Sequence, residues 1–264
     1  MCGRYAVTTD PARLATEIDA INEVTGLPRS ETPPQQPLDG LATGDQPPSR
    51  WENYNVAPTS TVLTVVDRHA PDSGATGPDV PARRIRAMRW GLVPPWAKEI
   101  GKGALFNARA ETAATKASFR ASVKSKRCLV PMDGWYEWRT ATGDDGKVKK
   151  VPYFMSPADH TRLFMGGLWS VWHPTDADPS DPPLLSCAIL TADAVGPLRE
   201  IHDRMPLIMP VQWWSAWLDP DAPAPADMLA PPSPALADAI EIREVSPLVN
   251  RVANNGPHLV DAVS

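Results

Sequence analysis

Cysteine is scarce in this sequence, and its cysteines show no paired spacing. Cys2, Cys128 and Cys187 are scattered and odd in number, which argues against a disulfide framework and against a zinc site. The five histidines are equally dispersed and no nucleotide-binding loop is visible, so we expect no metal and no cofactor. Cys128 and Cys187 lie inside apolar runs, where cysteine is usually a small buried hydrophobe; Cys2 does not.

Long apolar runs are also missing. No stretch of about 18 apolar residues is present, as a helix spanning a bilayer would require. The first ten residues, MCGRYAVTTD, have neither the basic start nor the apolar stretch of a signal peptide. We therefore expect a cytoplasmic protein with no membrane partner.

An excess of positive charge is the third feature the chain lacks. Its net charge is -5, whereas binding to a polyanion normally leaves a basic footprint. The segment from Arg83 to Arg127 departs from this average, with twelve Lys or Arg against only Glu99 and Glu111. This segment could face DNA, although a solvated basic face without a ligand would have the same composition.

The length and patterning of the chain predict an α+β fold. With 264 residues, of which 42% are apolar, the chain can bury a substantial core. Short β-type runs dominate and do not alternate with helices, which favours a mainly antiparallel sheet with a few peripheral helices. The predicted strands begin at Thr61, Arg83, Arg127, Thr161, Leu184, Met205 and Ala239.

Few helices are expected. Asp10 and Pro11 are typical of a helix start, and Leu14, Ile18 and Ile21 follow at helical spacing. Further helical segments are predicted around residues 112–123, after Pro210 and at residues 224–230.

Three tracts are rich in proline and poor in large apolar side chains: residues 27–50, 173–183 and 219–235. We interpret them as surface insertions rather than linkers. The whole chain, residues 1–264, is then predicted to form a single domain.

Cys2 has unusual chemistry if Met1 is removed, because cysteine is small enough for aminopeptidase removal of the residue before it. A terminal cysteine carries an amine with a pKa of about 7.7 to 8.0 beside a thiol of about 8.5. With an aldehyde, the amine forms a Schiff base and the thiolate closes onto the same carbon. The product is a five-membered thiazolidine, which resists hydrolysis better than the imine.

Two further segments are polar in ways that a core or a loop does not require. LFNARAET contains Asn107, Arg109 and Glu111; its asparagine could equally cap a following helix. DGWYEW places Glu137 among bulky aromatics, where desolvation would raise its pKa toward neutrality. The ordinary alternative for Glu137 is an exposed glutamate on a strand.

A histidine and two loops complete the set. His202 lies beside Asp203 and Arg204, which can set its charge, although a histidine at a strand edge is more often structural. The segments YNVAP (54–58) and RWGLVPPWAK (89–98) could form a surface on which bases stack, with buried core tryptophan as the alternative.

These segments closely resemble the SRAP domain family, known as SOS response-associated peptidases or abasic site processing proteins. MCGRY, YNVAP, WGLVPPW, FNARAET, DGWYEW and IHDRMPLI occur in the order of that family from residue 2 to about residue 218. A weaker match follows in NRVANNGPHLV.

The resemblance implies a role for each of four residues. Cys2 would be the nucleophile that forms the thiazolidine link to DNA, and Asn107 would position the cysteine or the sugar. Glu137 would transfer protons and help to open the deoxyribose ring. His202 would assist ring opening, the Schiff-base steps and reversal of the crosslink.

The resemblance also implies a partner, single-stranded DNA containing an abasic site, bound by a protein that we expect to be monomeric and associated with the nucleoid when on DNA. Phosphates around the lesion would be held by Arg4, Asn55, Arg109, Thr191 and Arg204. Bases would be wedged or stacked by Pro58, Trp96 and Trp138. Family members resemble lyases to a limited degree, and the peptidase label fits removal of the residue before Cys2.

Two other functions stay open on the sequence. Cys2, His202 and either Asn107 or Glu137 could form the catalytic set of a cysteine peptidase or N-terminal-nucleophile hydrolase. Alternatively, the basic segment and the tryptophans could make a non-enzymatic module that binds single-stranded DNA. Replacement of Cys2 by alanine separates the last hypothesis from the others.

Overall fold

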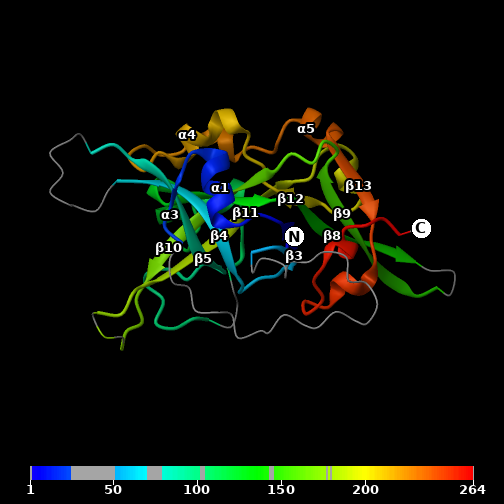
Figure 1. The fold of residues 1–264 in the computed structure, drawn as a ribbon, viewed down its shortest axis with the longest axis horizontal. Helices are drawn as coiled ribbons and strands as arrows, with labels where there is room; N and C mark the ends of the chain where they lie inside the picture. The colour runs from blue at the N-terminus through cyan, green and yellow to red at the C-terminus, as the bar shows by residue number, and fades with distance from the viewer. Residues whose placement is uncertain are drawn as a thin grey trace.

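A computed structural model describes residues 2–24, 51–69, 79–101, 105–142, 146–176, 178 and 180–263 (Figure 1). Its strands form two sheets. The first sheet is antiparallel throughout, with the order β13-β9-β8-β1-β3. Its strands are β1 (Tyr5–Val7), β3 (Asn53–Val56), β8 (Gly134–Thr142), β9 (Val148–Pro157) and β13 (Ile240–Glu244).

The second sheet curls back on itself. Its order is β12-β11-β10-β7-β4-β5-β2, and an additional parallel pairing between β11 and β5 joins five of these strands into a closed ring. Short β6 also pairs with β11 in parallel. The strands are β2 (Ile21–Asn22), β4 (Thr61–Arg68), β5 (Ala82–Trp90), β6 (Asn107–Arg109), β7 (Arg127–Met132), β10 (Leu163–Trp172), β11 (Leu184–Asp193) and β12 (Arg204–Pro206).

The helices are short and lie around the sheets. They are α1 (Pro11–Ile18), α2 (Ala110–Ala113), α3 (Arg120–Ser125), α4 (Trp214–Leu218) and α5 (Pro234–Asp238). Single 3₁₀ turns occur at η1 (Gly196–Glu200), η2 (Val211–Trp213), η3 (Ala226–Leu229), η4 (Pro247–Asn250) and η5 (Pro257–Leu259). The predicted α+β class with mainly antiparallel strands is therefore confirmed. Among the helices described, none is long and apolar enough to cross a membrane.

The start of α1 forms as its sequence predicts. The Asp10 carboxylate accepts hydrogen bonds from the backbone N–H groups of Ala12 (2.8 Å) and Arg13 (2.9 Å), and Pro11 occupies the first helical position. The helix ends earlier than expected. Asp19 adopts a left-handed conformation, and Ile21, which we expected on the helix, lies exposed in β2.

The other helical predictions have mixed outcomes. The segment 112–123 is not one helix, because α2 ends at Ala113 and α3 begins at Arg120. The segment after Pro210 forms η2 and α4, and η3 lies within residues 224–230, both as predicted.

The proline-rich tracts differ in their surroundings. The first, residues 27–50, lies outside the described residues. The described residues of the tract 173–183 are exposed in the connection between β10 and β11. In the third tract, Met228 is buried, and the carbonyl of Ala222 accepts a hydrogen bond from the buried Arg127 guanidinium (2.7 Å).

Candidate active site

Cys2 lies three residues before the start of β1. It is fully buried and belongs to the same apolar cluster as Trp90 and Trp135. Burial, followed by the nearby negative charge of Glu137, raises the pKa of the Cys2 thiol well above its ordinary value. The ordinary thiol pKa that we assumed from sequence is therefore wrong here, and the thiol needs a neighbouring base to lose its proton.

Asn107 fixes the backbone of Cys2. It is the first residue of β6, whose pairing with β11 places it opposite Ile189. Its side-chain amide donates a hydrogen bond of 2.7 Å to the carbonyl of Cys2. The Asn107 Oδ1 atom is buried, and no described group donates to it. This leaves one acceptor beside Cys2 that is available to a donor.

Glu137 lies on β8, opposite Tyr153 of β9. Because side chains alternate along a strand, only Trp135 of the neighbouring aromatics shares its face. The residue is 3% exposed, and burial raises the pKa of its carboxyl to about 7. The expected desolvation of Glu137 is confirmed, so its protonated and ionised forms coexist near neutral pH.

His202 faces Glu137 from the segment between η1 and β12. Its Nε2 atom is 4.0 Å from Glu137 Oε2, and Nδ1 accepts a hydrogen bond of 2.9 Å from the backbone N–H of Arg204. Burial lowers the pKa of His202, which favours the neutral ring. Nδ1 also lies 2.9 Å from Asp203 Oδ1, so each nitrogen of the ring faces a carboxylate with which it can exchange a proton.

A narrow hollow separates these two residues. Glu137 and His202 line it together with Trp135, Met155, Leu198 and Ile201. Arg204 and Met205 complete a lining that is mainly apolar, with Glu137, His202 and Arg204 as its polar residues.

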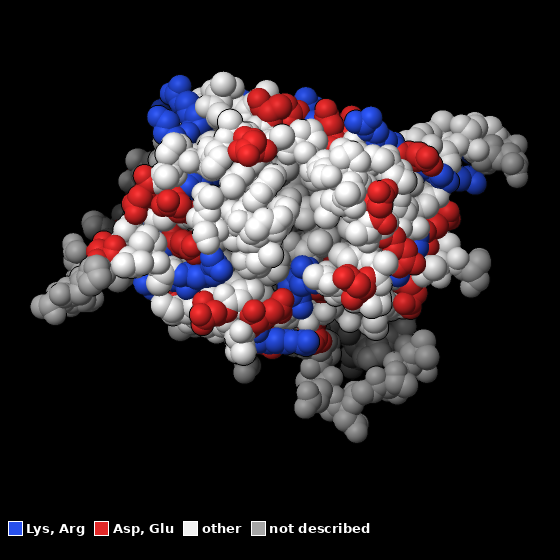
Figure 2. Space-filling model, turned by 90° about the horizontal axis from the view of Figure 1, so that it is seen from above, with Lys and Arg blue, Asp and Glu red and all other residues white. Residues whose placement is uncertain are grey.

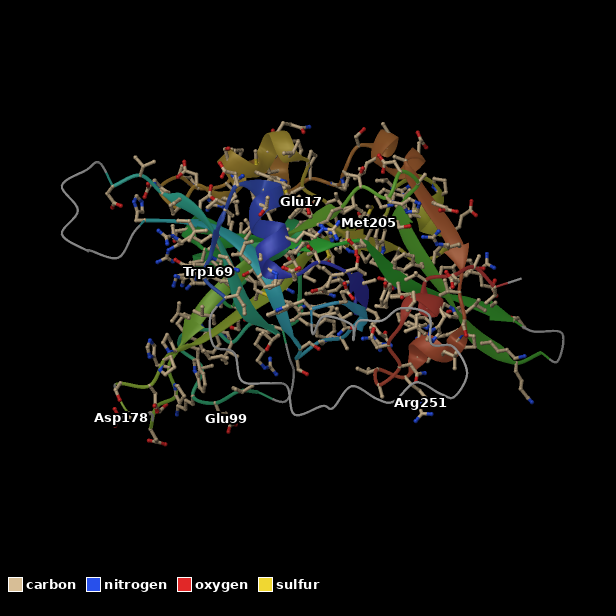
Figure 3. The ribbon with its side chains drawn as sticks, viewed as in Figure 1. Glu17, Glu99, Trp169, Asp178, Met205 and Arg251 are labelled. Atoms are coloured by element: carbon tan, nitrogen blue, oxygen red, sulfur yellow. The ribbon has the colours of Figure 1, made fainter. Side chains whose placement is uncertain are left out.

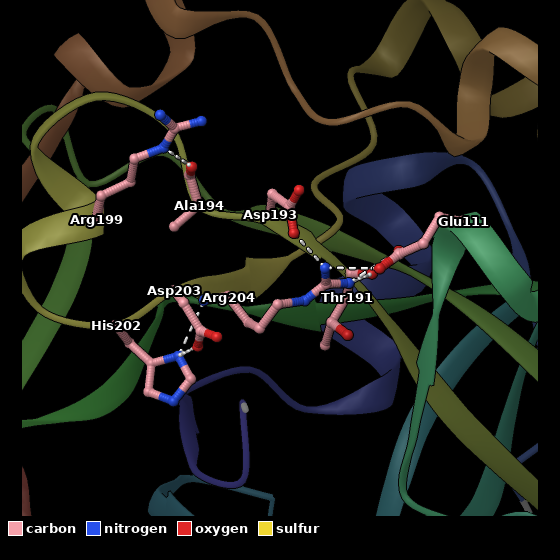
Figure 4. Close-up of polar contacts among 8 residues, drawn as sticks. All are labelled: Glu111, Thr191, Asp193, Ala194, Arg199, His202, Asp203 and Arg204. Atoms are coloured by element: carbon pink, nitrogen blue, oxygen red, sulfur yellow. Dashed lines mark hydrogen bonds and ion pairs between the residues drawn. The ribbon is translucent and has the colours of Figure 1, made fainter.

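Arg204 is held from several sides (Figure 4). Its guanidinium binds both oxygens of Glu111, at 2.7 and 2.9 Å, and also contacts Asp193. It further donates to the carbonyl of Thr191 at 2.7 Å. This clamp joins the FNARAET segment to the segment that carries His202. The proposed phosphate contact of Arg204 stays a prediction, and making it would require release of a carboxylate.

Arg4, Asn55 and Trp138 lie in one network with the C-terminal segment. The Arg4 guanidinium donates to Asn55 Oδ1 and to the carbonyl of Val249, both at 2.7 Å, and lies 5.9 Å from the centre of the Trp138 ring. The Trp138 indole donates to Asn250 Oδ1 at 2.7 Å. Buried Asn55 donates to the carbonyls of three residues, Val249, Arg251 and Asn254.

Sequence reasoning missed the structural part that residues 247–255 play beside the site. The asparagines of NRVANNGPHLV gave a usable signal, because Asn residues often hold irregular backbone through side-chain hydrogen bonds. Arg251 of this segment is exposed and points away from the body of the protein (Figure 3).

The remaining sequence-predicted contacts differ in their exposure. Trp96 is 68% exposed and Arg109 is also exposed, so both can reach a ligand. Pro58 is half-buried, whereas Thr191 is completely buried on β11. In the described part of the chain, no group of three or more His, Cys, Asp or Glu side chains could hold a metal ion.

Comparison with known proteins agrees with the resemblance in the motifs. The family described as SOS response associated peptidase (SRAP) matches residues 1–252. Abasic site processing protein YoqW of Bacillus subtilis is 34% identical over 263 residues, covering 99% of this chain and 100% of the relative. Abasic site processing protein HMCES of Rattus norvegicus is 32% identical over 235 residues, covering 78% of this chain and 63% of the relative.

A solved structure shares the fold. A protein of Bacteroides thetaiotaomicron superposes with a TM-score of 0.72 at 21% identity, covering 100% of both chains. The match to the family over most of the chain, the relatives and the order of the motifs all agree: this chain belongs to the SRAP family.

Proposed function

We propose that this protein processes abasic sites in DNA by capturing the aldehyde of the lesion with Cys2, after loss of Met1. The observation that carries the proposal is the convergence of four residues distant in sequence. Asn107 holds the Cys2 backbone, Glu137 acts electrostatically on the Cys2 thiol, and His202 faces Glu137. Relatives of this chain from bacteria and animals are abasic site processing proteins, which supports the same assignment.

The first steps open the sugar and form an imine. Neutral His202 accepts the proton of the C1' hydroxyl as the cyclic sugar opens to its C1' aldehyde, and the imidazolium returns a proton to the ring oxygen, which becomes the C4' hydroxyl. The free amine of Cys2 adds to C1', and the resulting carbinolamine loses its hydroxyl as water when protonated Glu137 supplies the proton. Glu137 is left as a carboxylate. Its pKa of about 7 makes both of its forms accessible at neutral pH.

The last step closes the ring. The Glu137 carboxylate accepts the proton of the Cys2 thiol, and the sulfur adds to the imine carbon to give a thiazolidine. Aldehyde and aminothiol thus become the thiazolidine and one water, and Glu137 ends protonated as it began. Burial raises the pKa of the thiol, so this transfer to a neighbouring base is what makes the thiolate available.

The finer features of the activity follow from this chemistry. Thiazolidine formation removes the imine through which β-elimination would cleave the strand, so lyase activity is limited. We infer that exposed Trp96 stacks on bases of single-stranded DNA and that the protein acts as a cytoplasmic monomer. Removal of Met1 by the protein itself would give it an autopeptidase activity of the type that its family name describes.

The test is a denaturing gel. The purified protein is incubated with a single-stranded oligonucleotide that carries one abasic site, and its Cys2→Ala and Cys2→Ser variants are run alongside. We expect a heat-stable adduct from wild type alone, formed without borohydride. Mass spectrometry of that adduct should give the sum of both components, without Met1 and minus one water. Absence of an adduct from protein that has lost Met1 and still binds the oligonucleotide would overturn the proposal.

A further inference from the structure

A DNA-binding protein with a net charge of -5 needs a local source of positive charge. In the basic segment 83–127, Lys98, Arg109, Lys116, Arg120 and Lys124 are exposed, whereas four of its arginines already have protein partners. Arg83 is paired with Asp67, and both Arg84 and Arg86 are paired with Glu23. Arg127 is buried and donates to backbone carbonyls. On the face that carries α4 and α5, basic and acidic side chains are interspersed (Figure 2).

The hairpin of β8 and β9 has a different charge pattern. It projects from the right-hand side of the molecule in Figure 1, and β13 pairs with β9 only from Tyr153 onward. Toward the tip the hairpin is therefore two-stranded. Three of its four cations, Arg139, Lys149 and Lys150, are exposed and have no carboxylate of the described residues paired with them. Its sequence also contains the fourth cation, Lys147, and two acids, Asp144 and Asp145.

The hairpin grows directly out of the candidate active site. Arg139 follows Glu137 by two residues, so both side chains lie on the same face, about 7 Å apart along the strand. Lys149, paired with Ala141, continues that face toward the tip. The Arg139 guanidinium lies 4.9 Å from the centre of the Tyr153 ring, and Tyr153 is the cross-strand partner of Glu137.

Lys150 is electrostatically connected to the site. It pairs with Thr140 on the opposite face of the hairpin. Burial is the main cause of the lowered pKa of His202, and the positive charge of Lys150 contributes to it. The cations thus begin two residues from Glu137 and extend outward to the level of Ala141, which is four residues or about 14 Å along the strand.

We propose that Arg139, Lys149 and Lys150 bind backbone phosphates of the DNA strand where it leaves the active site. The inference rests on the proposed function and extends it by assigning the strand a path along the hairpin. Exposed cations without a protein carboxylate release counterions when they meet phosphates, whereas paired arginines first have to give up an existing partner. The contact carries no base readout, which suits a lesion that can occur in any sequence.

Equilibrium binding as a function of salt tests the path. Fluorescence anisotropy is measured with a labelled abasic oligonucleotide in the Cys2→Ala background, which keeps binding reversible. A double variant, Lys149→Gln with Lys150→Gln, is compared with the parent and with a matched control, Lys116→Gln with Lys124→Gln. The control lysines are also exposed. Lys124 lies on α3, on the opposite side of the molecule from the hairpin (Figure 1).

Each phosphate contact to a single strand contributes about 0.7 to the magnitude of the slope of log K against log salt. The slope of the hairpin variant should therefore be smaller by about 1.4, and the slope of the control should not change. The lesion is then placed close to the 5' end or close to the 3' end of the oligonucleotide. The difference in slope between parent and hairpin variant should vanish in only one of these two oligonucleotides, the one that is too short to reach the hairpin. Equal slopes for parent and hairpin variant, or an equal loss in the control, would overturn the inference.

The crosslinking gel tests the proposed function independently of the hairpin path. A Cys2-dependent adduct together with unchanged slopes refutes the hairpin path alone. Absence of the adduct with a loss of slope confined to the hairpin variant refutes aldehyde capture and retains the path.

Discussion

Replacement of Glu137 by glutamine tests whether Glu137 supplies and accepts the protons in the proposed chemistry. The substitution keeps the size and polarity of the side chain but removes its exchangeable proton. Wild-type crosslinking needs a protonated Glu137, with a pKa of about 7, and an unprotonated Cys2 amine, with a pKa of about 7.7 to 8.0. The rate should therefore follow a bell-shaped curve with a maximum near pH 7.4, midway between the two values.

The size of the effect follows from the same two pKa values. Above the maximum, the protonated fraction of Glu137 falls to about one part in a hundred at pH 9 while the amine becomes fully available, so the rate should drop about ninefold. In the Glu137→Gln variant the falling limb should disappear and the rate should rise to a plateau set by the amine. At pH 7 the variant should be slower by about 10² to 10⁴, the range for loss of a general acid and base.

The assay is single-turnover crosslinking at saturating DNA, quenched at intervals and quantified on denaturing gels from pH 5.5 to 9. Oligonucleotide incubated alone at each pH corrects for spontaneous strand cleavage, and wild type and variant are first checked for complete removal of Met1. A falling limb that persists in Glu137→Gln, at the same pH as in wild type, would refute the assignment of the acid to Glu137.

Three further predictions concern stability and binding. Burial raises the folded-state pKa of Glu137 to about 7, whereas its unfolded value is about 4.3. The stabilising contribution of Glu137 is therefore full below about pH 4.3 and is lost as the pH rises through about 7. Glu137→Gln should stabilise the fold by roughly 3 kcal/mol more at pH 8 than at pH 4, measured by urea unfolding. Arg204→Ala should cost about 2 kcal/mol through loss of its bonds to Glu111 and Thr191, and an unchanged urea midpoint would show that this clamp is not structural. Trp96→Ala should leave thermal stability unchanged, because the side chain is 68% exposed, and should weaken binding of single-stranded DNA by about 1 to 3 kcal/mol; equal affinity in anisotropy titrations would exclude stacking on Trp96.

Sequence patterns predicted the strands that form the closed ring because these segments are short, rich in β-type residues and do not alternate with helices. RRIRAMRW and LLSCAILT became β5 and β11, and the run from Thr161 became β10. The strands around the site were harder to predict. β9 begins with exposed lysines and contains two prolines, and β6 is only three residues long, so neither has the period or length that a strand prediction requires.

The residues of the candidate site were predictable from the sequence. The burial of Cys2 and the contacts that hold the site in place were not. A carboxylate among aromatics signals desolvation, and the raised pKa of Glu137 agrees with that signal. No local pattern reveals that Cys2 is fully buried or that Glu111 holds Arg204, because both depend on pairings between segments that are distant in sequence. The ion pairs of Arg83 and Arg84 were hidden for the same reason, because their partners Asp67 and Glu23 are distant in sequence.

The protonation states of Cys2, Glu137 and His202 fit one another. Burial raises the pKa of the Cys2 thiol, raises that of Glu137 to about 7 and lowers that of His202, so each shift favours the neutral form. The neutral forms of these three side chains avoid the desolvation cost of buried side-chain charges before substrate arrives. The proposed cycle preserves this state, because Glu137 gives one proton to the departing hydroxyl and takes one from the thiol. A thiolate that formed before the aldehyde was bound would place an unpaired charge in an apolar cluster, and this is why proton transfer to Glu137 has to accompany, rather than precede, closure of the thiazolidine ring.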